Sequence, residues 1–119
     1  MRPLLCAVCL LSSLSAVAGP VDQNAALHAL EQPGTLLIDV RSTAEFAAGA
    51  LPGARNIAHT RIAAQIGEVT AAKDTPIVVY CRSGRRSSMA QEALAELGFT
   101  RVINGGGYED LKPVLESRE

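Results

Sequence analysis

One cysteine and three arginines stand close together in this chain, in the stretch formed by Cys81, Arg82, Ser83, Gly84, Arg85, Arg86 and Ser87. The apolar run 77–80 before this stretch predicts a buried strand, and the residues after it predict a helix. A loop that ends on a helix N-terminus directs backbone N–H groups into one concavity, where the helix dipole favours an anion. A thiol in that position is expected to have a lowered pKa, which nearby arginines lower further. The pattern therefore indicates a cysteine thiolate that acts on a small oxyanion.

Two other interpretations of this stretch stay open at this point. In the first, Cys81 packs as a small buried hydrophobe that is chemically inert, and the arginines form a solvated face. In the second, the loop belongs to a cysteine phosphatase or an arsenate reductase, which also bind an oxyanion at a helix N-terminus. Phosphatase loops resemble C-x5-R, whereas the sixth position after Cys81 is Ser87 and the fifth is Arg86. The loop therefore fits a single sulfur atom better than a tetrahedral phosphate.

The elements that must position this loop alternate between strand and helix patterns. Strands are predicted at 35–40, 77–80 and 101–103, and helices at 21–31, 43–48, 61–69, 87–97 and 108–116, the last broken or kinked near Pro113. Continuous apolar strands separated by helices predict the α/β class, with a mostly parallel sheet that helices cover on both faces.

The helix at 87–97 carries the clearest end signals of the chain. Ser88 and Gln91 have the spacing of a capping box at its start, and Gly98 marks its end. Its spacing predicts one buried face, made of Met89, Ala90, Ala93, Leu94 and Leu97.

The first residues have the pattern of an export signal. Arg2 precedes a short apolar run, and Ala16, Val17 and Ala18 provide a small-x-small cleavage site. We therefore predict a signal peptide at 1–18, one domain at 19–119 and a periplasmic protein. Cleavage would remove Cys6 and Cys9, so that Cys81 is the only cysteine left.

Composition narrows the classes of function. The chain has 119 residues, of which 48% are apolar, and a formal net charge of -1. This excludes a disordered chain and argues against a basic nucleic-acid binder. Two histidines distant in sequence and no clustered carboxylates predict no metal site.

Three motifs together resemble the rhodanese family of sulfurtransferases. The 81–87 stretch is similar to the family's C-x-x-G-x-R-S loop. The segments 37–41, 45–46 and 49–57 are similar to its D-V-R, E-[FY] and G-H-[IL]-P-G-A-x-N-I signature, and 102–107 falls at its late G-G turn. The resemblance is greatest to small single-domain periplasmic rhodaneses such as the phage-shock type. The chain departs from the family at Ala50, where a histidine is usual, and at the tryptophan after the G-G turn, whose space Tyr108 is expected to fill in part.

The resemblance implies a role for each matched residue. Cys81 would be the nucleophile that becomes a persulfide, and the backbone amides of 82–86 would hold its outer sulfur. The side chains of Arg82, Arg85 and Arg86 would attract thiosulfate. The remaining matched residues, expected to support the loops through ion pairs, are Asp39, Arg41 and Glu45.

The resemblance and the composition together predict the partners, and some alternative functions stay open. The partners are a small anionic sulfur donor and a thiol or cyanide acceptor, without cofactor, nucleic acid or membrane contact after signal cleavage, and the protein is expected to be a monomer. The rival functions are a persulfide carrier without turnover or a binding module and, with less support, the phosphatase or reductase above.

Overall fold

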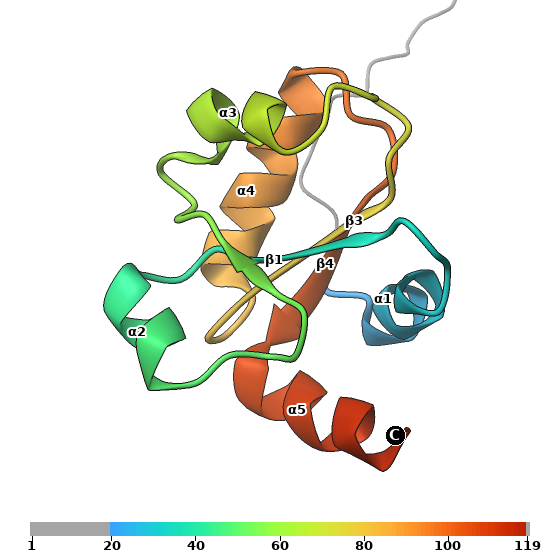
Figure 1. Cartoon of the computed structure of the whole chain (residues 1–119), viewed down its shortest axis with the longest axis vertical. Coiled ribbons are helices and arrows are strands. Elements are labelled where there is room, and N and C mark those ends of the chain that lie inside the picture. The colour runs from blue at the N-terminus through green and yellow to red at the C-terminus, as the bar shows by residue number, and fades with distance from the viewer. Residues whose placement is uncertain (1–19, 119) are drawn as a thin grey trace, which may run out of the picture.

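A computed structural model describes residues 20–118 and confirms the α/β class (Figure 1). The sheet has four strands, all parallel, in the order β2-β1-β3-β4. The strands are β1 (Leu36–Asp39), β2 (Arg55–Asn56), β3 (Ile77–Cys81) and β4 (Val102–Gly107). The helices are α1 (Gln23–Leu30), α2 (Thr43–Ala48), α3 (Ile62–Gln65), followed by a 3-10 turn (Ile66–Glu68), α4 (Arg85–Glu96) and α5 (Tyr108–Ser117).

Helices cover both faces of the sheet, as the sequence predicts (Figure 1). Side chains alternate along β3, because successive residues of a strand point to opposite faces. Val79 and Cys81 pack on the side of α3 and α4, whereas Val78 and Tyr80 pack on the side of α1 and α5. The core therefore has two halves, and the predicted nucleophile lies in the half that contains α4.

The carboxyl ends of the strands bring the predicted site residues together. Asp39 pairs with Tyr80 across β1 and β3, and Cys81 pairs with Gly107 across β3 and β4. Parallel strands that end at the same edge form the usual place for a ligand in this class of fold. The sheet thus places the residues that follow β1 beside the loop that follows β3.

The structure corrects two details of α4. The predicted capping box at Ser88 and Gln91 is wrong: the helix begins at Arg85 with Gly84 as its N-cap, and the Gln91 side chain instead donates to the Val102 carbonyl. The predicted buried face is also wrong at its edges, because Met89 is 51% exposed and Leu97 is 40% exposed. Ser87 is buried although it is polar, so the face of α4 that carries Ser87 is directed toward the sulfur of Cys81.

Other boundaries also differ from the sequence prediction. The two-residue strand β2 was not predicted, the helix predicted at 61–69 divides into α3 and a 3-10 turn, and β4 extends through three glycines beyond the strand predicted at 101–103. The helix α5 runs through Pro113 without a break.

Residues 1–19, which include the predicted signal peptide with Cys6 and Cys9, lie outside the described part of the chain. Within residues 20–118, no helix is both long and apolar enough to cross a membrane.

Candidate active site

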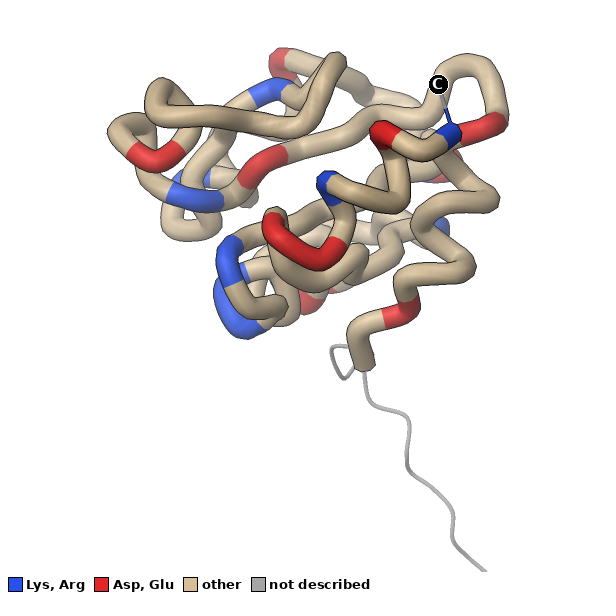
Figure 2. The backbone as a smooth tube through the Cα atoms, turned by 90° about the horizontal axis from the view of Figure 1, so that it is seen from below, with Lys and Arg blue, Asp and Glu red and all other residues tan. Residues whose placement is uncertain are grey.

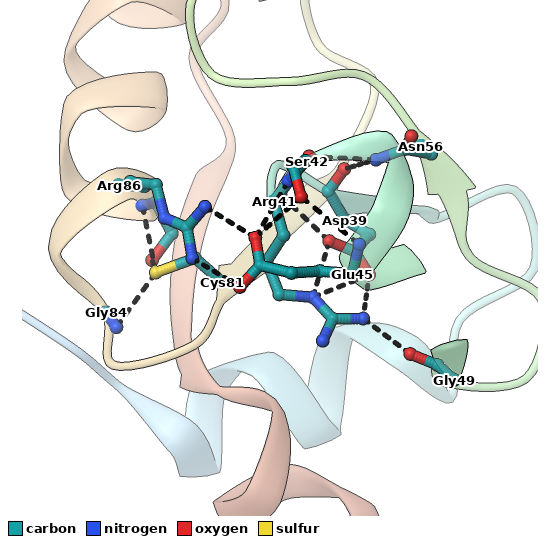
Figure 3. Close-up of polar contacts among 10 residues, drawn as sticks. Asp39, Arg41, Ser42, Glu45, Gly49, Asn56, Cys81, Gly84 and Arg86 are labelled. Atoms are coloured by element: carbon teal, nitrogen blue, oxygen red, sulfur yellow. Dashed lines mark hydrogen bonds and ion pairs between the residues drawn. The ribbon is translucent and has the colours of Figure 1, made fainter. Parts of the chain in front are cut away.

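The loop after β3 turns back on itself so that the sulfur of Cys81 meets the first turn of α4. Gly84 makes this turn in the left-handed region, with φ of +95°, where a residue with a Cβ is strained. Its N–H donates to Cys81 Sγ over 2.9 Å (Figure 3). The N–H of Ser87 donates to the same atom over 3.4 Å. The first N–H groups of a helix need acceptors from outside the helix. Gly84 has no side chain to supply one, so the sulfur takes that place.

These contacts act on the acidity of Cys81. Burial favours the neutral thiol and so acts to raise the pKa, but hydrogen bonds from the Ser87 side chain and from the backbone of Ser87, Ser83 and Gly84 outweigh it. The pKa of Cys81 therefore lies below its ordinary value, as the sequence predicts. The lowering comes from hydrogen bonds at the helix N-terminus, the first of the two causes predicted, and the arginines, the second predicted cause, are not among the main contributions.

Cys81 is fully buried and is the one free cysteine among residues 20–118. The sequence left open whether this thiol is buried and inert or exposed for chemistry. The structure combines burial with a lowered pKa, because the side chain points back into the amides of its own loop instead of out to solvent. The flanking residues Arg82, Ser83 and Arg85 are exposed.

A second layer of polar groups lies behind the sulfur. Ser87 Oγ lies 3.4 Å from Cys81 Sγ and donates to Asn104 Oδ1 over 2.7 Å. Asn104, on β4, is only 1% exposed, and its Nδ2 donates to the Gly84 carbonyl. The loop and the helix N-terminus are thus fixed to the neighbouring strand by one amide side chain.

Glu45 links the second predicted motif to the loop. Its carboxylate accepts two hydrogen bonds from Arg86, of 2.8 and 3.0 Å, and also accepts from the N–H and the hydroxyl of Ser42, the N-cap of α2 (Figure 3). The bond from Arg86, followed by the bond from Ser42, lowers the pKa of Glu45 to about 2. The guanidinium of Arg86 is therefore a fixed charge held beside the loop.

Asp39 and Arg41 form a buried ion pair at the end of β1. The Arg41 guanidinium donates to both carboxylate oxygens of Asp39 and to the Gly49 carbonyl. It also lies over the rings of Tyr80 and Tyr108, with 5.7 and 4.5 Å from its Cζ to the ring centroids. These contacts hold the segment around Gly49 against the sheet, which is the loop-fixing arrangement expected from the sequence.

A pocket of about 290 Å³ opens beside the loop. Basic and acidic side chains line it together with two small residues and a tyrosine: Arg41, Glu45, Ala48, Gly49, Arg82, Tyr108 and Glu109. Cys81 does not line the pocket, although the next residue along the chain does. Arg82 belongs to both the pocket and the loop.

Comparison with known proteins shows the family. The family model described as Rhodanese-like domain matches residues 22–112. The chain belongs to this family. The match spans the strands, the Cys81 loop and the first half of α5, and it confirms the resemblance found in the sequence.

Relatives and solved structures support the same assignment. The thiosulfate sulfurtransferase PspE of Escherichia coli is 36% identical over 74 residues, which cover 62% of this chain and 71% of that protein. The thiosulfate sulfurtransferase GlpE of Pseudomonas fluorescens is 34% identical over 83 residues, 69% of this chain and 74% of that protein.

Among solved structures, a rhodanese with anions from E. coli matches with a TM-score of 0.62 at 36% identity, covering 64% of this chain and 89% of that one. A human single-domain sulfurtransferase matches with a TM-score of 0.63 at 27% identity, covering 78% and 91%. The fold is that of a single rhodanese-like domain.

The rhodanese-like fold gathers most of the predicted residues. Gly84 and Ser87 contact the sulfur, and Glu45 holds Arg86. Asp39 and Arg41 bind each other at the pocket wall, one strand away from the sulfur. The arginines Arg82 and Arg85 are exposed on the loop. Elsewhere in the described chain, basic and acidic residues are interspersed (Figure 2).

Sequence reasoning missed Asn104. No clear signal marked it, because the predicted strand ended at residue 103, whereas β4 continues through Asn104 to Gly107 and buries this side chain. The position of Tyr108 was anticipated in part: its ring stacks on Tyr80 with 6.3 Å between centroids and covers the Arg41 guanidinium.

Proposed function

We propose that the chain is a thiosulfate sulfurtransferase with Cys81 as its nucleophile. Relatives named thiosulfate sulfurtransferase at 34% and 36% identity support a sulfurtransferase function. The observation that carries the proposal is the sulfur of Cys81, held by backbone N–H groups at the N-terminus of α4. Such groups stabilise negative charge on sulfur without any movement of charged side chains.

The reaction has two displacements at sulfur. The Cys81 thiolate attacks the outer sulfur of thiosulfate, the S–S bond of the donor breaks, and sulfite leaves with the bonding electron pair. Cyanide or a thiolate then attacks the outer sulfur of the Cys81 persulfide, and the Cys81 thiolate leaves. No net oxidation or reduction by an external reagent is needed, and the lowered pKa of Cys81 favours the attacking thiolate without a dedicated general base.

The loop also determines how the donor reaches the sulfur. Cys81 is covered in the structure, whereas Arg82 and Arg85 are exposed on either side of Gly84. The two guanidinium groups attract the dianion, and its approach requires the loop residues over the sulfur to move. The mixed-charge pocket next to Arg82 offers room for the acceptor.

Mass spectrometry of the intact mature protein tests the proposal. Thiosulfate should add the mass of one sulfur atom, about 32 Da, cyanide should remove it, and Cys81→Ser should show neither change. A persulfide that forms but turns over slowly with small acceptors would identify a sulfur carrier instead. No added mass with a reduced Cys81 would refute the sulfurtransferase function and favour a binding module.

An aryl phosphate distinguishes the phosphatase alternative. A phosphatase of this type needs an arginine whose guanidinium binds the phosphate, but Arg86 is held by both oxygens of Glu45. We therefore expect no hydrolysis. Release of the aryl alcohol that depends on Cys81 would overturn the sulfurtransferase proposal.

We also propose that the protein is exported to the periplasm after cleavage behind Ala18 and acts as a monomer. The support for export is the pattern of residues 1–18, and the monomer is carried over as an expectation from the sequence. Fractionation followed by mass measurement of the N-terminal peptide tests the first statement. Light scattering after size-exclusion chromatography tests the second.

A further inference from the structure

Asn104 is a buried polar residue that touches three parts of the site. Its Oδ1 accepts from Ser87 Oγ over 2.7 Å and from the Gly106 N–H over 3.0 Å, and its Nδ2 donates to the Gly84 carbonyl over 3.1 Å. Rotating the amide by half a turn would place its NH2 group against the Gly106 N–H, so the orientation is fixed. Both polar atoms of the Asn104 side chain are thus hydrogen-bonded to residues that surround Cys81.

The Ser87 hydroxyl has one proton and two neighbours. A hydroxyl donates a single hydrogen bond, and a carboxamide oxygen only accepts. With its proton on Asn104 Oδ1, Ser87 presents a lone pair to Cys81 Sγ, 3.4 Å away. This arrangement suits a thiol, which donates its S–H proton, but it offers nothing to a thiolate.

The ionised form of Cys81 needs the opposite orientation. A thiolate only accepts, so it gains a hydrogen bond if the Ser87 hydroxyl turns its proton toward the sulfur. Asn104 Oδ1 then still accepts from the Gly106 N–H and is not left without a partner. The two arrangements differ by one rotation of a buried hydroxyl.

We propose that Asn104 is a positioning residue: its carboxamide oxygen holds the Ser87 proton while Cys81 is a thiol and releases it to the sulfur when Cys81 ionises. Asn104 therefore competes with the thiolate for one hydrogen bond. The importance of this competition for turnover rests on the proposed function, but the competition itself does not.

Alkylation of Cys81 by iodoacetamide, measured against pH, tests the proposal. Asn104→Leu keeps the size of the side chain and frees the Ser87 proton, so alkylation below pH 7 should become faster, on the order of three- to tenfold for one exchanged hydrogen bond. Ser87→Ala should slow it. In the double variant, Asn104→Leu should add nothing, because its effect acts through Ser87.

The controls separate this effect from general loosening of the fold. Gln91→Met also removes a hydrogen bond from a side-chain amide of α4 to β4, but this bond ends on the Val102 carbonyl, away from the sulfur. This variant should leave the pH profile of alkylation unchanged. The charged residues around the loop are kept in every variant: Arg41, Glu45, Arg82, Arg85, Arg86 and Asp110. Circular dichroism checks folding, and Asn104→Ala replaces the Leu variant if that variant does not fold.

Two results would overturn the proposal. An unchanged or slower alkylation in Asn104→Leu would show that the amide acts only as a clamp on Gly84. A faster alkylation that persists without Ser87 would show that the loop has simply opened. If the variants give the expected alkylation profiles but the wild-type protein forms no persulfide with thiosulfate, the proposed function is refuted and the role of Asn104 still holds.

Discussion

Replacing Glu45 by Gln should weaken the attachment of α2 to the Cys81 loop by about 1 to 2 kcal/mol. Gln keeps an oxygen that accepts from the Ser42 N–H, so the capping box survives while the negative charge facing Arg86 is lost. The side chains of Arg86 and Glu45 are 29% and 27% exposed. This places the pair between exposed pairs, which contribute about 0.2 to 1 kcal/mol, and buried pairs, whose disruption costs about 3 to 5 kcal/mol.

The pH dependence of this pair has a definite sign. The pKa of Glu45 falls from an ordinary 4.5 to about 2 in the folded protein. A carboxylate whose pKa is lowered by folding stabilises the fold fully above its unfolded pKa, and that stabilisation is lost as the pH falls toward the folded pKa. The difference in stability between wild type and Glu45→Gln should therefore be constant near pH 7 and should shrink between pH 4.5 and about 2.

Urea denaturation at a series of pH values measures this difference. Glu92→Gln, on the exposed side of α4, makes the same change in net charge and should cost less than about 0.5 kcal/mol. A double-mutant cycle with Arg86→Gln isolates the pair. A coupling energy under about 0.3 kcal/mol, or a difference independent of pH, would refute the reasoning.

Three further substitutions test the packing around the site. Tyr80→Phe removes the hydroxyl that accepts from the Leu51 N–H and should lower the free energy of unfolding by about 1 to 3 kcal/mol, measured by urea denaturation; an unchanged stability would contradict the buried bond. Gly84→Ala should destabilise the protein by about 1 to 3 kcal/mol and slow alkylation of Cys81, because alanine is strained at a φ of +95°. Met89→Gln should change the melting temperature little, since this side chain is 51% exposed; a large loss would show that it is covered in solution.

The sequence was most informative where one physical signal dominated. The apolar run of β3 and the glycine of the loop predicted a strand, a turn and a helix N-terminus in the right order, and the family motifs predicted Cys81 as the nucleophile. β2 was missed because its two residues, Arg55 and Asn56, carry no strand pattern.

Other details depend on contacts that a sequence does not contain. The start of α4 at Arg85 depends on the Cys81 sulfur accepting from its N–H groups, and no propensity rule counts a cysteine three residues before an N-cap as a capping group. Met89 has the right spacing for the core but points to solvent, because Ser87 occupies the buried side beside Asn104. The pairing of Arg86 with Glu45 joins residues 41 positions apart, which no local pattern could have shown.

Capping of α4 by the sulfur of Cys81 means that chemistry at this atom also changes the thermodynamics of folding. A thiolate holds the first turn of the helix more strongly than a thiol does, and the lowered pKa of Cys81 makes this contribution largest at alkaline pH, with loss as the pH falls through the folded pKa. If Cys81 carries a bulky adduct or is over-oxidised, either the modified group still accepts from the N–H groups of Gly84 and Ser87, or the first turn of α4 is destabilised. The thermal stability of the protein should therefore report the chemical state of the Cys81 sulfur.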